Sequence, residues 1–321
     1  SSLAEVGCVN QTITADQEAT PYSCSATSAG GLAAEQTVTI KRDGTAPSVS
    51  FDEVVSGTLG ANGWYTSDVL ARFTATDALS GPATASQDAS TSGQGSAVIL
   101  SSPQFSDAAG NTTEAGAVTR SYKIDKTAPT NVTFVGGPAA DSAVYFGSVS
   151  AQPTCTADDA TSGVASCVVT GYSTAVGTHT MTATATDNAG WTSTETRKYT
   201  VSSWTTEGFR APVDMGTDVL NRVKGGSTVP LKFELFAGST ELTSITAVSS
   251  FTTSRIVCGT NTVEDAVEFV TTGGTSLRYD STGGQFIQNW KTPTAIGCYA
   301  ATMTAADGST SGTEVILRSP E

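Results

Sequence analysis

The chain has 321 residues, of which 38% are hydrophobic and 14% charged, and its formal net charge is −14. This excess of negative charge disfavours binding to phosphate backbones and to anionic lipid surfaces, so nucleic acid is not an expected partner. No apolar stretch is long enough to cross a bilayer, so no membrane insertion is expected. The 32 glycines and the long Thr/Ser/Ala runs suit small β domains with thin cores.

Alternation with a period of two is the recurring pattern, and it predicts half-buried antiparallel strands. It is clearest over residues 178–185, where threonine occupies every second position. Long helical periodicity is absent from the sequence. The chain is therefore predicted to be all-β and built of β-sandwiches.

The pentapeptide Asp-x-Thr-Ala-Pro occurs twice, at 43–47 and 125–129, and its two copies are 125 − 43 = 82 residues apart. A repeat of this length is a domain rather than a solenoid coil. Each proline lies between two strand-like runs, lacks a ladder donor and keeps the preceding residue extended. We therefore expect a short, stiff connection between β modules, with boundaries that give the segments 1–44, 45–126, 127–204 and 205–321.

Residues 1–44 match only the second half of a module, because residues 22–31 align with 181–190 and no counterpart of 127–163 precedes them. A sandwich without its first strands would leave open edges and an exposed core face. We therefore expect the chain to be part of a longer protein or to be completed by another segment.

The six cysteines fall into three pairs that are local in the sequence. None lies in a CxxC motif, and His179 is the only histidine, so zinc or thioredoxin-like chemistry has little support. Disulfides persist in oxidising compartments and stabilise small sandwich domains. An extracellular protein, secreted or on the cell surface, is predicted, with the disulfides Cys8–Cys24, Cys155–Cys167 and Cys258–Cys298.

Each Asp-x-Thr-Ala-Pro linker is followed by two acidic loops. Loops that leave a sandwich at the same end cluster together, so their carboxylates are expected to converge on the linker aspartate. These carboxylates would repel one another. A calcium ion, which takes about six to eight oxygen ligands, would bind all of them and hold the linker and the loops together. Alternatively, the aspartates only cap turns and stay solvated. The calcium interpretation names Asp43, Asp77, Asp107, Asp125, Asp159 and Asp187 as ligands.

No catalytic constellation is found. A single histidine in an alternating threonine run does not supply a catalytic triad. Neighbouring carboxylates such as Asp158 and Asp159 are more often solvated or metal-bound in a sandwich loop than a glycosidase pair. The chain is therefore not expected to be an enzyme. Trp64 and Trp191 are the candidate ligand-binding residues, since exposed indoles can stack on sugar rings, although packing explains them equally well.

The order of these motifs resembles a known family. Asp-x-Thr-Ala-Pro, then Ala-Thr-Asp-x-x-Ser-Gly at 75–81 and Asp-x-Ala-Gly-Asn at 107–111, are similar to the bacterial immunoglobulin-like repeats of large secreted and surface proteins, especially actinobacterial ones. This resemblance covers residues 1–203. It implies tandem immunoglobulin-like β-sandwich modules in an elongated array. Similar repeats of bacterial adhesins hold calcium with linker aspartates, which favours the calcium interpretation.

The last segment resembles a different family. Residues 226–233 contain the strand Val-Pro-Leu-Lys-Phe, followed by Cys298-Tyr299 and by Asp307-Gly308-Ser309. This order is similar to the PxKF-type domain found at the C-terminal ends of actinobacterial extracellular proteins. Val229, Leu231, Phe233 and Leu235 are expected to point inward, and Pro230 to lie at an edge or a bulge.

Two functions stay open. The first is a non-catalytic extracellular spacer or adhesion region of a larger secreted or cell-surface bacterial protein, with a surface polysaccharide or a protein as its ligand. The second is the C-terminal accessory tail, with carbohydrate binding as its role, of a secreted polysaccharide-active enzyme whose catalytic domain lies upstream.

Overall fold

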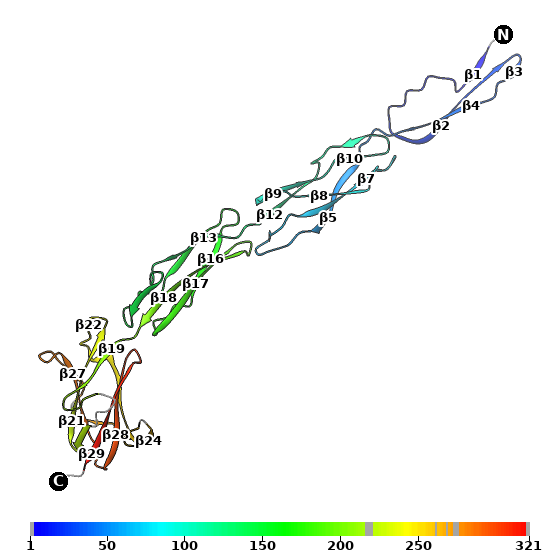
Figure 1. Cartoon of the computed structure of the whole chain (residues 1–321). Coiled ribbons are helices and arrows are strands. Elements are labelled where there is room, and N and C mark those ends of the chain that lie inside the picture. The colour runs from blue at the N-terminus through cyan, green and yellow to red at the C-terminus, as the bar shows by residue number, and fades with distance from the viewer. Residues whose placement is uncertain (1–2, 216–220, 261, 268, 272–275, 319–321) are drawn as a thin grey trace. The chain divides into compact units, whose positions relative to one another are not determined.

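The computed structural model describes residues 3–215, 221–260, 262–267, 269–271 and 276–318. These residues form β-strands joined by turns, with a single short 3-10 turn, η1, at Ile245–Ala247 (Figure 1). The prediction of an all-β chain is therefore confirmed. The chain divides into two compact units, the first made of residues 1–132, 157–167 and 185–193, and the second of 133–156, 168–184 and 194–321.

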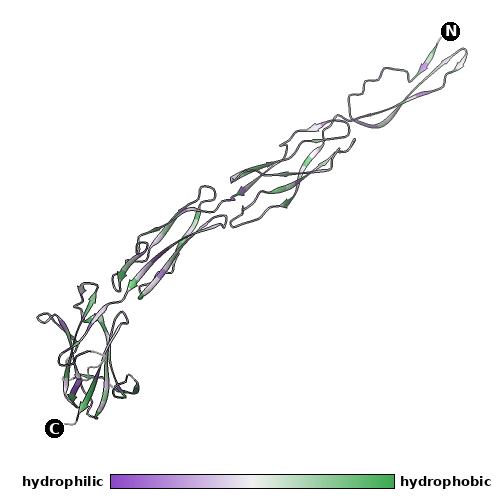
Figure 2. Ribbon diagram, viewed as in Figure 1, coloured by the Kyte–Doolittle hydropathy of each residue, from purple (hydrophilic) through white to green (hydrophobic). Residues whose placement is uncertain are grey.

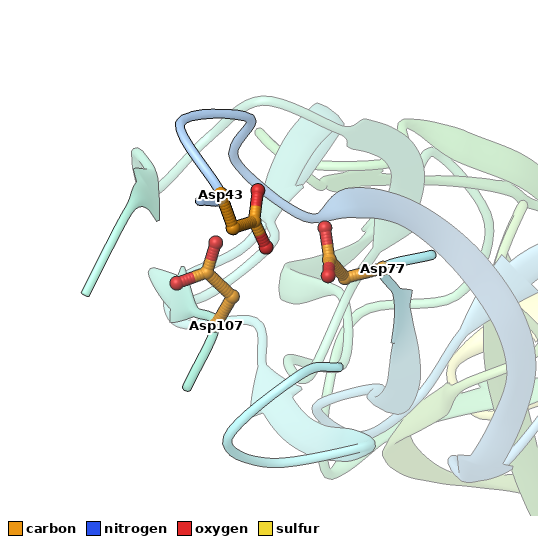
Figure 3. Close-up of side chains that lie close together, drawn as sticks. All are labelled: Asp43, Asp77 and Asp107. Atoms are coloured by element: carbon orange, nitrogen blue, oxygen red, sulfur yellow. The ribbon is translucent and has the colours of Figure 1, made fainter. Parts of the chain in front are cut away.

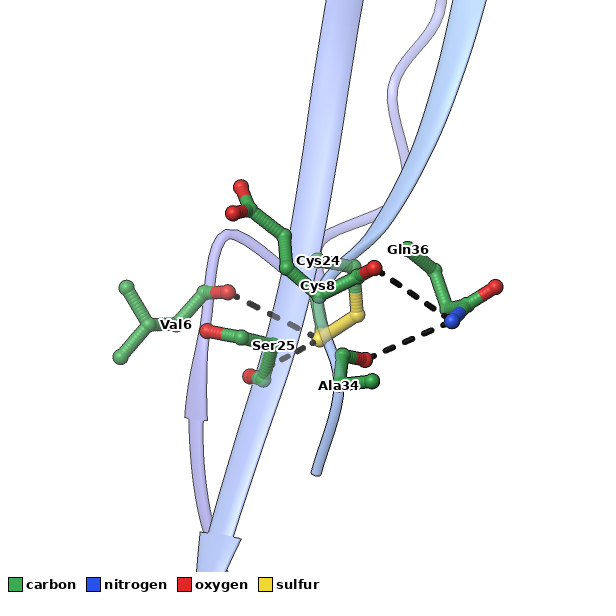
Figure 4. Close-up of a disulfide and its surroundings, with 7 residues drawn as sticks. Val6, Cys8, Cys24, Ser25, Ala34 and Gln36 are labelled. Carbon is green, nitrogen blue, oxygen red and sulfur yellow. Dashed lines mark hydrogen bonds between the residues drawn. A yellow bond between two sulfur atoms is a disulfide. The ribbon is translucent and has the colours of Figure 1, made fainter. Parts of the chain in front are cut away.

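The first unit begins with a sheet built around one long strand. Strand β2 (Gln17–Ser28) pairs antiparallel with β1 (Ala4–Val6), β3 (Gly31–Leu32) and β4 (Gln36–Arg42). A disulfide joins Cys8, just after β1, to Cys24 within β2 (Figure 4). Apolar side chains of this sheet stay exposed, including Leu32 at 74%. The disulfide and the backbone hydrogen bonds between strands therefore stabilise this sheet more than a hydrophobic core does.

Strands β5 to β12 form a sandwich in the first unit. One sheet has the order β5-β7-β8, a second has β6-β12-β9, and β10 pairs with β11. Phe73, fully buried on β7, packs with Leu100 of β9 and Phe105 of β10, so the sheets enclose a common core. Cysteine is absent from this segment, so packing alone holds it. Its strands are β5 (Ser48–Ser56), β6 (Trp64–Tyr65), β7 (Leu70–Thr76), β8 (Ser86–Ser90), β9 (Gly95–Ser101), β10 (Phe105–Ser106), β11 (Thr112–Thr113) and β12 (Thr119–Ile124).

The next strands form a two-stranded sheet, β13-β15, and a four-stranded sheet, β14-β18-β17-β16. Strand β17 contains the threonine alternation seen in the sequence. Its threonines are outward or half-buried, whereas Met181, Ala183 and Ala185 are fully buried. The strands are β13 (Thr130–Val135), β14 (Ser142–Tyr145), β15 (Thr154–Asp158), β16 (Val164–Thr170), β17 (Gly177–Asp187) and β18 (Thr192–Ser202).

The C-terminal part of the second unit is a larger sandwich. One sheet runs β19-β21-β27-β25, with β22 beside β21 and β26 beside β27, and the other runs β20-β29-β28-β23-β24. Apolar stretches mark these strands in Figure 2. The strands are β19 (Thr205–Arg210), β20 (Asn221–Lys224), β21 (Thr228–Ala237), β22 (Thr240–Glu241), β23 (Val248–Ile256), β24 (Val263–Val267), β25 (Val270–Thr271), β26 (Arg278–Asp280), β27 (Gln285–Lys291), β28 (Gly297–Ala305) and β29 (Thr310–Arg318).

Strand β21 explains the Val-Pro-Leu-Lys-Phe motif. Its alternate residues Val229 to Leu235 are buried, and Phe233 stacks on Phe286 of β27 with ring centroids 5.3 Å apart. Pairing of β21 with β19 ends at Lys232, so Pro230 pairs only with β27. The missing N–H of Pro230 thus lies on an open side of the strand, where it interrupts no ladder.

All six cysteines lie among the described residues, and none of them is free. One disulfide joins Cys8 to Cys24 and another joins Cys258 to Cys298, and Cys155 and Cys167 are also disulfide-bonded. These are the pairs that their spacing in the sequence suggests. No helix in the described part of the chain has the length and apolarity needed to span a bilayer.

Candidate metal centres

Six aspartates gather in two clusters, both in the first unit. Within each cluster, one carboxylate oxygen from each of the three residues lies within 4.8 Å of the others. Figure 3 shows the side chains of the first cluster near one another. The first cluster is Asp43, Asp77 and Asp107, and the second cluster is Asp125, Asp159 and Asp187.

The strands place these residues. In the first cluster, the aspartates directly follow the ends of β4, β7 and β10. In the second, Asp125 follows β12, Asp159 follows β15 and Asp187 is the last residue of β17. Because these strand ends meet, residues at least 187 − 159 = 28 positions apart in the sequence converge, as the motif order predicts.

The middle aspartate of each cluster is held by the backbone of its own loop. Asp77 Oδ1 accepts hydrogen bonds of 2.9–3.1 Å from three successive amides. Asp159 Oδ1 accepts three from the corresponding amides, at 2.6–3.2 Å. Both loops end in glycine, Gly81 at φ +76° and Gly163 at φ +80°, a backbone conformation that disfavours a Cβ. Each carboxylate is therefore oriented before any ligand arrives.

The third aspartate of each cluster differs in its partners. Asp107 is satisfied at both oxygens by Asn111, whose backbone amide reaches Oδ1 at 2.8 Å and whose side-chain amide reaches Oδ2 at 2.7 Å. Asp187 Oδ1 accepts three backbone amides, from Ala189 to Trp191, at 2.7–2.9 Å. Trp191 stands four residues after Asp187, as Asn111 does after Asp107, but its bulky ring replaces the amide.

The side chains of Asn111 and Trp191 both donate a hydrogen bond to the backbone carbonyl of a linker aspartate. The Asn111 side-chain amide donates to the carbonyl of Asp43 at 3.2 Å, and the Trp191 indole N–H donates to the carbonyl of Asp125 at 3.0 Å. Each thus fixes the linker aspartate of its cluster. Only the Asn111 side chain also donates to the third aspartate of its cluster, whereas Trp191 reaches Asp187 with its backbone amide alone.

Two carboxylate oxygens of the second cluster are buried without a partner. Asp125 is 0% exposed and Asp187 is 1% exposed, and the Oδ2 atoms of both lack a hydrogen-bond partner among the residues that the structure describes. Asp125 Oδ1, by contrast, accepts the Thr127 amide and hydroxyl at 3.0 and 2.9 Å. Burying a carboxylate oxygen without compensation is costly, so buried charges are usually paired or bound to a metal.

The electrostatics of the two clusters differ accordingly. Burial raises the pKa of Asp187, and the nearby negative charge of Asp125 adds to this rise. In the first cluster, hydrogen bonding from the Ser80 side chain and from the Thr45 amide lowers the pKa of Asp43. None of the ion pairs found among the described residues involves an aspartate of either cluster. The negative charge of the second cluster is therefore uncompensated by protein cations.

These groups suit a hard cation. Calcium binds oxygen at about 2.3–2.6 Å, so two ligands on opposite sides of one ion lie about 4.6–5.2 Å apart. The 4.8 Å limit within each cluster is compatible with a single ion. All three groups are carboxylates, and the clusters contain no nitrogen or sulfur ligand. The second cluster, with its two bare oxygens, fits such an ion better than the first.

The two candidate ligand-binding tryptophans and the single histidine have other partners. Trp64 is only 7% exposed, and Lys123 Nζ lies 6.0 Å from the centroid of its ring, so little indole surface is left for a sugar. Trp191 is 39% exposed, but its N–H is taken by Asp125. His179 Nε2 lies 2.6 Å from the carbonyl oxygen of Ala175.

Comparisons with known proteins concern the fold. No family model matches the chain, and no curated protein matches it. Among solved structures, the adhesin described as "Ca2+-stabilized adhesin helps an Antarctic bacterium reach out and bind ice" is 14% identical, with a TM-score of 0.28, covering 94% of this chain and 81% of the adhesin. A tandem pair of titin immunoglobulin domains is 12% identical, with a TM-score of 0.21, covering 60% of this chain and all of the pair.

A third structure is that of a Bacteroides ovatus mixed-linkage glucan utilisation protein in complex with a heptasaccharide. It is 14% identical, with a TM-score of 0.16, and the match covers 45% of this chain and 30% of that protein. The described residues form several β-sheets that follow one another along the chain, so the fold is that of an all-β protein built of β-sandwiches. The actinobacterial origin and the PxKF-type assignment stay predictions, since no family model matches.

Proposed function

We propose that this chain is a non-catalytic extracellular spacer or adhesion region of a larger secreted or cell-surface bacterial protein, in which calcium fastens successive β-sandwich modules. The observation that carries the proposal is the pair of buried, unpartnered oxygens, Asp125 Oδ2 and Asp187 Oδ2, that share a cluster with Asp159. A divalent cation would compensate the charge that protein groups leave unpaired.

The position of the second cluster suits a clamp. Asp125 lies on the linker that follows β12, whereas Asp159 and Asp187 lie in two loops of the following segment. An ion bound by all three residues would connect the linker to both loops. In a spacer, such a bond restricts motion at the linker, because the metal replaces repulsion between carboxylates by shared coordination.

Other features support an extracellular, non-catalytic role. The absence of free cysteine suits an oxidising compartment. The only histidine contacts a backbone carbonyl. A surface polysaccharide or a protein remains the proposed ligand class. Neither candidate tryptophan favours the accessory-tail alternative, because Trp64 is buried and Trp191 donates its N–H inside the second cluster.

Calorimetric titration of the full chain with calcium, after stripping with chelator, tests the proposal. We expect binding by the parent chain and loss of one binding event in Asp159→Asn, which keeps the loop hydrogen bonds but removes a charged ligand. Asp88→Asn is the matched control, since Asp88 lies outside the clusters and pairs with Arg72 at 2.9 Å. Absence of calcium binding by the parent, or an equal loss in the control, would contradict the proposal.

A further inference from the structure

We infer that calcium in the second cluster and the docking of a loop from the preceding segment strengthen each other, an inference that rests on the proposed function. We call residues 60–62 the docking loop and residues 187–191 the ligand loop. The docking loop belongs to the sandwich of residues 45–126. The ligand loop starts at Asp187, which is the last residue of β17 and belongs to the second cluster.

The two loops make specific contacts. The Ala61 amide donates to the carbonyl of Ala189 at 2.8 Å, and the Asn62 side-chain amide donates to the carbonyl of Asn188 at 3.1 Å. Asn62 has φ +51°, a left-handed conformation that asparagine tolerates better than most residues. At Gly60, a Cβ would lie 2.3 Å from the Ala189 carbonyl oxygen. Glycine is therefore needed at position 60 for the loops to approach this closely.

The same ligand loop carries one carboxylate of the second cluster, that of Asp187. Asp187 Oδ1 accepts the amide of Ala189 at 2.9 Å, so the carboxylate and the docked carbonyl belong to one rigid turn. Trp191 donates its indole N–H to the carbonyl of Asp125, and the Asp125 amide donates to the carbonyl of Tyr65 at 2.8 Å. These hydrogen bonds form a ring of contacts. The sandwich that carries the docking loop contacts the linker through Tyr65 and Asp125, the linker contacts the ligand loop through Trp191, and the ligand loop contacts the docking loop through Ala189 and Asn188.

This circuit couples ion binding to docking. Without an ion, the bare Oδ2 atoms of Asp125 and Asp187 repel each other, which pushes the ligand loop away from the linker and so from the docking loop. With an ion, both oxygens are drawn to one centre and the loop is held in its docked position. Coupling between two sites is reciprocal, so docking must raise calcium affinity by the same factor by which calcium favours docking.

Gly60→Ala tests the coupling, because it obstructs docking and leaves every carboxylate in place. The variant is made in a chain that also carries Asp77→Asn, so that calorimetry reports calcium binding at the second cluster. We expect calcium affinity to fall about tenfold, within the range usual for coupled sites. Gly30→Ala is the matched control, because its Cβ would meet nothing closer than Ser28 Oγ at 3.6 Å.

A second variant and a second measurement complete the test. Asn62→Gly removes one docking hydrogen bond while tolerating the left-handed conformation, and it should weaken calcium binding less than Gly60→Ala. In the parent, calcium should slow hydrogen exchange of the Ala61 amide, which is protected only when docked. The inference alone is overturned if Asp77→Asn binds calcium and neither docking variant, Gly60→Ala or Asn62→Gly, changes that affinity. It is also overturned if calcium binds but leaves the exchange rate of the Ala61 amide unchanged. Absence of calcium binding in Asp77→Asn overturns the proposed function as well.

Discussion

Replacing Asp125 by asparagine separates its two roles, as a turn residue and as a metal ligand. The turn role uses Oδ1, which accepts the Thr127 amide and hydroxyl at 3.0 and 2.9 Å. An asparagine carbonyl oxygen can accept the same two bonds. The metal role uses Oδ2, which is buried without a partner and becomes an uncharged amide group in the variant.

The two roles predict opposite effects on stability. Two unit charges 4.8 Å apart, the largest separation within the cluster, repel each other by about 3.5 kcal/mol at an effective dielectric constant of about 20. In chelator, Asp125→Asn removes this repulsion and should be more stable than the parent. At a calcium concentration about 100 times the dissociation constant, the parent gains about 2.7 kcal/mol of unfolding free energy. The variant, which lacks one charged ligand, should gain much less.

Calorimetric melting of the parent and of Asp125→Asn, each in chelator and in excess calcium, measures these opposite changes in stability. For a module of about 80 residues, 1 kcal/mol shifts the melting temperature by about 4–8 °C, so calcium should raise that of the parent by about 10–20 °C. Asp141→Asn is the control, since Asp141 is exposed and lies outside both clusters. Equal melting of the parent in the two buffers, together with a variant less stable in both, would make Asp125 a turn residue only.

Two further predictions concern the rest of the chain. Tyr279 donates a 2.6 Å hydrogen bond to Glu241, which raises the pKa of Tyr279 to about 12. Because this folded value exceeds the ordinary tyrosine pKa, the stability from this contact is present below about pH 10 and is lost as the pH rises through the folded pKa. Ultraviolet titration should show one late tyrosine that Glu241→Gln moves earlier; an unchanged titration curve would refute the assignment. Phe73→Ala should lower unfolding free energy by about 3–5 kcal/mol in urea denaturation, because the side chain is fully buried in a segment without disulfides. The exposed Val54→Ala should have little effect, and equal losses in the two variants would mean that Phe73 does not anchor this core.

The sequence by itself determined the strands and the placement of the acidic groups. Burial with a period of two is a local property, so the alternation around Met181 and Phe233 predicts which side chains face inward. The aspartates follow strand ends, and strands of a sandwich end together, so the convergence of Asp125 with Asp159 and Asp187 could be expected from motif order. Cysteines close in the sequence likewise suggested their own partners.

Only the tertiary structure decided which carboxylate oxygens are left bare and what surrounds them. The Trp191 indole reaches a carbonyl 66 residues away, and Asn62 reaches one 126 residues away. An Asn-Gly pair at 62–63 signals a turn, but nothing local names the turn's distant partner. The burial of Trp64 likewise depends on its packing within the fold. Solvation and hydrogen bonding of a carboxylate are set by every atom that packs around it, and those atoms are assembled only when distant strands meet.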